Sequence, residues 1–241
     1  MTVHPGLAVG RGRRRFYTGI ALAIAITVFA GFSQSYYLRT YYNSTPLARL
    51  LHLHGLVFTG WILLFLAQST LIAAGRTALH RRLGVAGAVL AALLVVVGTT
   101  TAIVRAAEGA APTGVPPLSF LAVPFFDMVV FTGLAATGLW YRRRADIHKR
   151  LLTLATIALL AAPIARLPFG AQMVGLPGVF ALANLFVAAC IVYDVTTLRR
   201  VHPATVWGGL AIVLSQPLRL AISGTGLWLG FAAWLTRPFA G

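Results

Sequence analysis

Long apolar runs separated by short polar turns fill the chain from residue 16 onward. A helix needs about 20 apolar residues to cross the roughly 30 Å hydrocarbon core of a bilayer. Seven runs have this length, and they predict transmembrane helices at residues 16–38, 47–73, 79–104, 118–141, 147–167, 176–198 and 204–223. An eighth run, 226–234, is too short to span and contains Trp228 and Trp234, so it predicts an interfacial segment. We therefore expect one all-α membrane domain, with a basic tail (1–15), a seven-helix bundle (16–224) and an interfacial C-terminal segment (225–241).

Composition supports this class. The 241 residues are 59% hydrophobic and 10% charged, whereas a soluble domain carries about 25% charged residues. The net charge of +16 comes from short clusters of cations between the apolar runs, which argues against a nucleic-acid-binding face. The single cysteine, Cys190, lies inside an apolar run and excludes a disulfide framework. No nucleotide-binding loop, nucleophile elbow, CxxC or HExxH motif is present.

Cations also predict the orientation, because cytoplasmic loops collect Lys and Arg. Fourteen of the 20 lysines and arginines fall in the N-terminal tail and in the loops on the same side. This bias predicts a bacterial inner-membrane protein with a cytoplasmic N-terminus. The RGRRR cluster before the first run also resembles a signal peptide, but Ala30 and Gly31 make a poor cleavage site, so we expect an uncleaved first helix.

An internal repeat appears when the chain is shifted by 68 residues. The segment Arg76-x-x-x-His80-Arg81-Arg82-Leu83 then falls on Arg144-x-x-x-His148-Lys149-Arg150-Leu151, and Arg199-Arg200-x-His202 precedes the seventh helix in a looser version. The repeat predicts one leading helix followed by three parallel helical hairpins.

Three histidines, His80, His148 and His202, begin helices at the basic turns. We favour their interpretation as markers of a repeated interfacial turn. The alternative is a three-histidine site for haem or a transition metal, with Asp146 or Asp194 accepting a hydrogen bond from a ring. The neighbouring arginines disfavour a divalent ion there.

A second set of polar residues lies inside the apolar runs, where polar groups are costly. At a rise of 1.5 Å per residue, all fall in the outer half, near the breaks expected at Pro163 and Pro217. We expect them to line one outward-facing cavity that binds a small molecule, a lipid headgroup or an ion, with Gln34, Tyr36 and Tyr37 able to close over it. The predicted ligand-binding residues are His52, His54, Asp127, Arg166, Asn184, Gln216 and Arg219.

Charge predicts the pairing within this set. Asp127 should form an ion pair with Arg166 or Arg219, which leaves the other arginine free for an anionic or carbonyl-bearing ligand. The alternative interpretation is an ion-pair and hydrogen-bond network that holds the helices together.

The HLHG motif (His52–Gly55) with Trp61, the Arg76–Gly84 turn and the Asp146–Arg150 segment together resemble a family of uncharacterised multi-pass inner-membrane proteins found in many bacteria. This resemblance spans residues 47 to 202 and implies a location and no particular activity. Histidines at the ends of short helices are also similar to those of small cytochrome-oxidase assembly proteins and membrane b-type cytochromes. That likeness implies a haem hypothesis, with His80 and His148 as the pair to test.

Three functions follow from these patterns. The first is a binding or transport protein that uses the outer cavity and has membrane lipids as partners. The second is a haem- or metal-binding redox or assembly protein. The third is an enzyme that acts on a lipidic substrate, with Asp127 and either His52 or His54 as acid and base.

Overall fold

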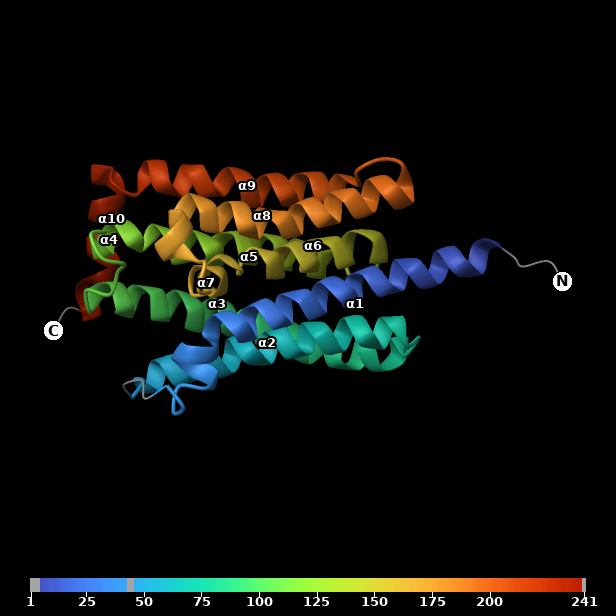
Figure 1. Ribbon diagram of the computed structural model, residues 1–241, viewed down its shortest axis with the longest axis horizontal. Coiled ribbons are helices and arrows are strands. Elements are labelled where there is room, and N and C mark those ends of the chain that lie inside the picture. The colour runs from blue at the N-terminus through green and yellow to red at the C-terminus, as the bar shows by residue number, and fades with distance from the viewer. Residues whose placement is uncertain (1–4, 43–45, 240–241) are drawn as a thin grey trace.

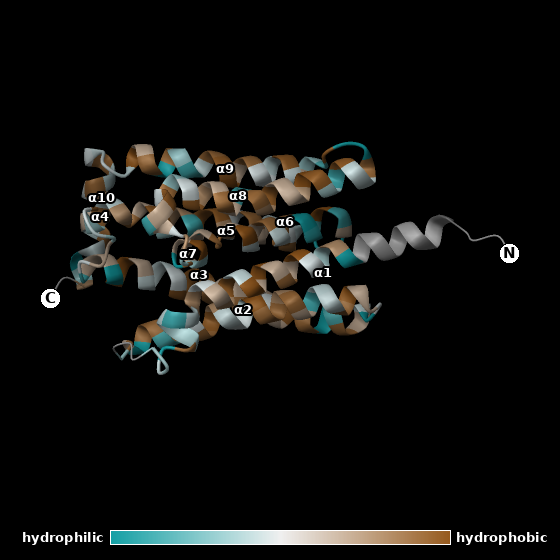
Figure 2. Ribbon diagram, in the orientation of Figure 1, coloured by the Kyte–Doolittle hydropathy of each residue, from teal (hydrophilic) through white to brown (hydrophobic). Residues whose placement is uncertain are grey.

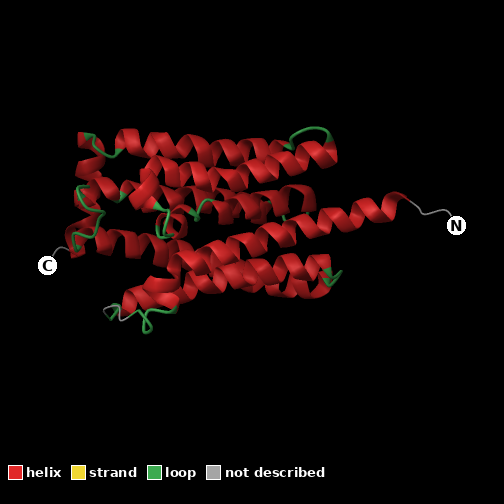
Figure 3. Cartoon of the chain, viewed as in Figure 1, coloured by secondary structure: helices red, strands yellow, loops and turns green. Residues whose placement is uncertain are grey.

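The computed structural model describes residues 5–42 and 46–239, with side chains from residue 15 onward. Every regular element in these residues is helical (Figure 1; Figure 3). The elements are α1 (Pro5–Phe32), η1 (Ser33–Tyr37), α2 (Arg49–Ala73), α3 (Thr77–Ala107), α4 (Pro117–Phe120), α5 (Ala122–Trp140), α6 (Ala145–Ile157), α7 (Ala161–Ala165), α8 (Ala171–Leu198), α9 (Pro203–Ile222), α10 (Gly226–Thr236) and η2 (Arg237–Phe239).

Within the described residues, seven helical stretches are long and apolar enough to cross a membrane, which confirms the number expected from the apolar runs. They cover 15–37, 49–73, 77–107, 117–140, 145–165, 171–198 and 203–222. The largest difference is at the N-terminus, where α1 already begins at Pro5. Most of the segment expected as a basic tail is therefore continuous with the first helix, while residues 1–4 lie outside the described residues.

Proline breaks the fifth stretch into α6 and α7. A proline ring clashes with the carbonyl four residues earlier, and α6 indeed ends at Ile157, shortly before Pro163. This broken stretch lies at the centre of the bundle. In its most apolar part 72% of the residues are buried, whereas in that of α2 only 17% are. The close approach of α1 requires a glycine, because a Cβ at Gly31 would lie 2.1 Å from the Pro163 carbonyl oxygen.

Glycine and proline also set the start of the sixth helix. Within α8, Gly175 has φ of 64°, a left-handed conformation that glycine adopts without a steric penalty, and Pro177 follows two residues later. The continuous helix therefore begins next to residue 176, where the apolar run predicted it. Pro217, in contrast, is accommodated within α9.

Packing builds the bundle from two groups of helices. In the first group, α2 packs against α1 and α3, and α3 packs against α5. In the second group, α6 and α9 pack against each other, and each of them also packs against α5 and α8 (Figure 1). Trp61 of α2 joins the groups by packing edge-on against Phe131 of α5 and donating to Thr156 Oγ1 of α6 at 3.3 Å. Hydrophobic residues (brown) extend along the length of the bundle, and hydrophilic residues (teal) gather toward its ends (Figure 2).

The two ends of the bundle differ. One end, called the turn end, holds the short α2–α3, α5–α6 and α8–α9 connections, and the opposite end, called the α10 end, carries α4 and α10 (Figure 1). At the α10 end, Trp228 is 6% exposed and donates to the Leu118 carbonyl oxygen at 2.9 Å. The segment expected to be interfacial therefore packs on α3 and α4, and of its two tryptophans only Trp234 is exposed.

Candidate functional site

Asp127 of α5 forms an ion pair with Arg219 of α9, one of the two partners that the sequence predicted. Both side chains are buried, at 8% and 2% exposure. Arg219 also donates to the Val123 carbonyl oxygen at 3.2 Å, to the Ser215 carbonyl oxygen at 3.1 Å and to Ser215 Oγ at 2.8 Å. Each of the three guanidinium nitrogens thus donates to a group of the protein, and the pair is neutral as a unit.

A second polar contact lies beside this pair. Asn184 of α8 donates to Gln216 Oε1 at 2.8 Å, and Gln216 returns a bond to Asn184 Oδ1 at 3.0 Å. The two carboxamides satisfy each other and tie α8 to α9 in the apolar interior. Gln216 stands one turn before Arg219 on α9, which brings both polar contacts to one level of the bundle.

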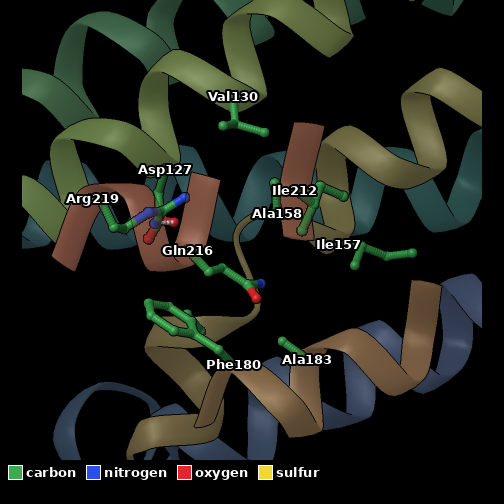
Figure 4. Close-up of a pocket in the computed structure, with 10 residues that line it drawn as sticks. Asp127, Val130, Ile157, Ala158, Phe180, Ala183, Ile212, Gln216 and Arg219 are labelled. Carbon is green, nitrogen blue, oxygen red and sulfur yellow. Dashed lines mark hydrogen bonds and ion pairs between the residues drawn. The ribbon is translucent and has the colours of Figure 1, made fainter. Parts of the chain in front are cut away.

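A cavity lies beside Asp127, Gln216 and Arg219 (Figure 4). Its volume is about 10 Å³, roughly the room that one water molecule occupies. Apart from Asp127, Gln216 and Arg219, its walls are apolar. In this conformation the cavity therefore accommodates a water molecule or an ion of similar size. The apolar lining residues are Val130, Ile157, Ala158, Ala161, Phe180, Ala183 and Ile212.

Four residues of the same predicted set do not line this cavity: Asn184, which bonds to Gln216, and Arg166, His52 and His54. Arg166 follows α7, donates to the Ala162 carbonyl oxygen at 2.7 Å and lies over the Phe32 ring at 4.9 Å. It is within electrostatic range of His54 on α2. The predicted single cavity is thus divided between the Asp127 cavity and a second place, formed by the end of α1, the start of α2 and the end of α7, which we call the Arg166 cluster.

His54 has an unusual environment in the Arg166 cluster. Its ring stacks on Phe58, with centroids 4.0 Å apart, and its Nδ1 is buried without a hydrogen-bond partner. Tyr36 of η1 covers the neighbouring turn, where its hydroxyl donates to the His52 carbonyl oxygen at 3.3 Å. Tyr36, one of the tyrosines expected to close over this region, therefore packs onto the start of α2. The expected acid–base pair of Asp127 with His52 or His54 has no support, because neither histidine lines the Asp127 cavity.

A network at the turn end was not predicted as such. Arg150 of α6 and Asp194 of α8 form an ion pair at 6% and 0% exposure. Asp194 also accepts from Thr205 Oγ1 at 2.6 Å and from the His202 backbone N–H at 3.2 Å. The network joins α6, α8 and α9. Its sequence signal was Asp194 itself, one of only four acids and placed in an apolar run.

The three turn histidines separate into a pair and a single residue. His80 and His148 lie together, with ring centroids 6.3 Å apart and planes crossing at 79°. His202 instead lies 3.2 Å from Asp146 Oδ2, and its Nδ1 accepts from the Ala204 N–H at the start of α9. Among the described residues, no three His, Cys, Asp or Glu side chains are placed to share a metal ion.

All four acidic side chains have a cationic partner. Besides the two buried pairs, Glu108 pairs with Arg105, and Asp146 with Arg144 and His202. No acid is therefore left for Arg166, which makes it an unneutralised cation in the predicted binding set.

No family model matches the chain, and no curated protein or solved structure matches it either.

Proposed function

We propose that the chain is a multi-pass protein of the bacterial inner membrane with its N-terminus in the cytoplasm, so that the α10 end faces outward. Seven apolar helices support this proposal, as do large apolar side chains exposed along them, such as Leu63, Val89 and Val96. Water would disfavour such a surface, whereas lipid chains accommodate it. The arginines of the three turns, at the opposite end, follow the positive-inside rule.

The hairpin repeat is part of this proposal. Helices α3 and α6 begin at Thr77 and Ala145, and their caps are Arg76 and Arg144, so both boundaries differ by the 68 residues of the sequence repeat. We propose that α2–α3, α5–α7 and α8–α9 are three related hairpins that follow the leading helix α1.

The function that the geometry supports best is binding of a small anionic ligand at the outward-facing Arg166 cluster. The observation that carries it is that Arg166 is the arginine of the predicted binding set that has no acidic partner: Arg219 pairs with Asp127, whereas Arg166 hydrogen-bonds only to a backbone carbonyl. A planar guanidinium suits a carboxylate or a phosphate. The unpartnered His54 Nδ1 supplies a second group that a ligand would satisfy.

The Asp127 cavity has a supporting role in this function. Its charged and polar groups satisfy one another, so it fixes α5, α8 and α9. A ligand larger than water enters it only if these helices separate.

Thermal unfolding of the detergent-purified chain against inorganic phosphate, at constant ionic strength, tests the proposal. We expect a saturable rise in Tm that Arg166→Gln abolishes. Arg237→Gln is the matched control, since it removes an exposed arginine at the same end, and it should keep the rise. A rise retained in Arg166→Gln would contradict the proposal.

A second experiment distinguishes a lipid headgroup from a soluble anion as the ligand. The same variants are compared in vesicles of phosphatidylcholine alone and with phosphatidylglycerol added. Stabilisation by phosphatidylglycerol without a phosphate effect would assign a lipid headgroup as the ligand, whereas a phosphate effect indicates a soluble anion. Failure of both experiments overturns the binding function.

A further inference from the structure

We propose that His80 and His148 bind a monovalent soft metal ion, Cu(I), between their rings at the turn end. The two residues come from different hairpins, since His80 is the fourth residue of α3 and His148 the fourth residue of α6. Their rings nevertheless meet, at a centroid distance of 6.3 Å. The inference is independent of the Arg166 cluster, which lies on other elements.

Hydrogen bonding leaves a free nitrogen on each ring. His148 Nδ1 lies 2.8 Å from the Gly138 carbonyl oxygen, and donation to that oxygen leaves Nε2 with its lone pair. Metal-binding histidines commonly donate their other N–H to a backbone carbonyl in this way. His80 Nδ1 is buried and has no hydrogen-bond partner. A buried nitrogen without a partner is destabilising, and a bound metal ion would satisfy it.

The ring separation fits a shared ion. With metal–nitrogen bonds of about 2.0 Å and a nitrogen about 1.1 Å from its ring centre, two imidazoles on opposite sides of an ion have centroids about 6.2 Å apart. At a tetrahedral angle the same bonds give about 5.1 Å. The observed 6.3 Å matches the linear arrangement, which the d¹⁰ ion Cu(I) accepts with only two ligands.

The surroundings favour a low charge and few ligands. No third His, Cys, Asp or Glu of the described residues joins the pair, which leaves a four-coordinate Zn²⁺ without its usual ligands. Arg81 lies within electrostatic range of His80, and the neighbouring Arg76 and Arg82 are exposed. Repulsion from these cations is half as large for a monovalent ion as for a divalent one.

The test is Cu(I) binding by the full chain in detergent, after chelator treatment and under anaerobic reducing conditions. Competition with a coloured Cu(I) chelator should give one Cu(I) per chain, and X-ray absorption should show two nitrogen ligands. His80→Gln and His148→Gln should each lower Cu(I) affinity at least tenfold. His202→Gln, a matched control in the third turn, should keep it.

Several outcomes would overturn the assignment. Substoichiometric copper, a wild-type Cu(I) affinity in either the His80 or the His148 variant, or tighter binding of Zn²⁺ than of Cu(I) each rejects it. A Soret absorption band in the purified chain that both variants lose would assign the pair to haem iron instead. Should a variant fail to fold, X-ray absorption of the wild-type chain decides, since three or four ligands contradict a two-histidine site. The phosphate-binding result for Arg166→Gln tests the Arg166 cluster alone and does not bear on the His80–His148 site.

Discussion

Replacing Asp127 by asparagine tests whether the Asp127–Arg219 pair holds α5 against α9. The substitution leaves a guanidinium that is 2% exposed without its counter-charge. Breaking a buried ion pair by removing one partner costs about 3–5 kcal/mol. Arg219 keeps its bonds to Val123 and Ser215, so we expect a loss near the lower end, about 3 kcal/mol in the free energy of unfolding.

The double variant Asp127→Leu with Arg219→Met distinguishes the cost of one unpaired buried charge from the net contribution of the ion pair. Apolar replacement of both members of a buried pair is often neutral or stabilising, so the double variant should be at least about 2 kcal/mol more stable than Asp127→Asn. Glu108→Gln is the control, because the Glu108–Arg105 pair is half exposed. Such surface pairs contribute about 0–1 kcal/mol.

Equilibrium unfolding in mixed micelles, followed by circular dichroism and tryptophan fluorescence, measures these differences. The reasoning is refuted if Asp127→Asn unfolds within about 1 kcal/mol of the wild-type chain. It is also refuted if the double variant is no more stable than Asp127→Asn, since the unpaired arginine would then have no cost of its own.

Three further predictions use the same unfolding assay. Asp194→Asn should cost about 3 kcal/mol, because it strips the counter-charge from a buried arginine of α6; stability equal to wild type would contradict the buried network. Thr205→Val, which removes one hydrogen bond to that carboxylate, should cost about 1–3 kcal/mol, and an unchanged midpoint would show that the bond contributes nothing. Gly31→Ala should cost at least about 1–3 kcal/mol through overpacking against α7, whereas Gly19→Ala, with open space around its Cβ, should be neutral or stabilising; equal effects at both glycines would refute the close approach.

The helix breaks show how much local chemistry predicts. The ring of Pro163 and the special conformation of Gly175 act on residues within one turn, so their effects on α7 and α8 follow from short stretches of sequence. The α10 segment was predicted less well. Its length showed that it does not span, but burial of Trp228 depends on α4, which lies more than 100 residues earlier.

The candidate sites divide in the same way. Depth along a helix follows from counting residues, and it correctly brought Asp127, Gln216 and Arg219 to one level. It did not separate Arg166 from them, because residues at equal depth can lie on opposite sides of a bundle. The choice of Arg219 over Arg166 as the partner of Asp127 needed the contact between α5 and α9.

The sequence by itself determined the seven apolar helices, their approximate ends and the residues that carry charge into them. Those properties are local, since they depend on the length of an apolar run and on the residues that interrupt it. Only the tertiary structure decided that His80 meets His148 while His202 turns to Asp146, and that Asp194 receives Arg150. The physical reason is that pairing depends on the rotation of each helix about its axis and on its choice of neighbours, which close packing of the whole bundle sets.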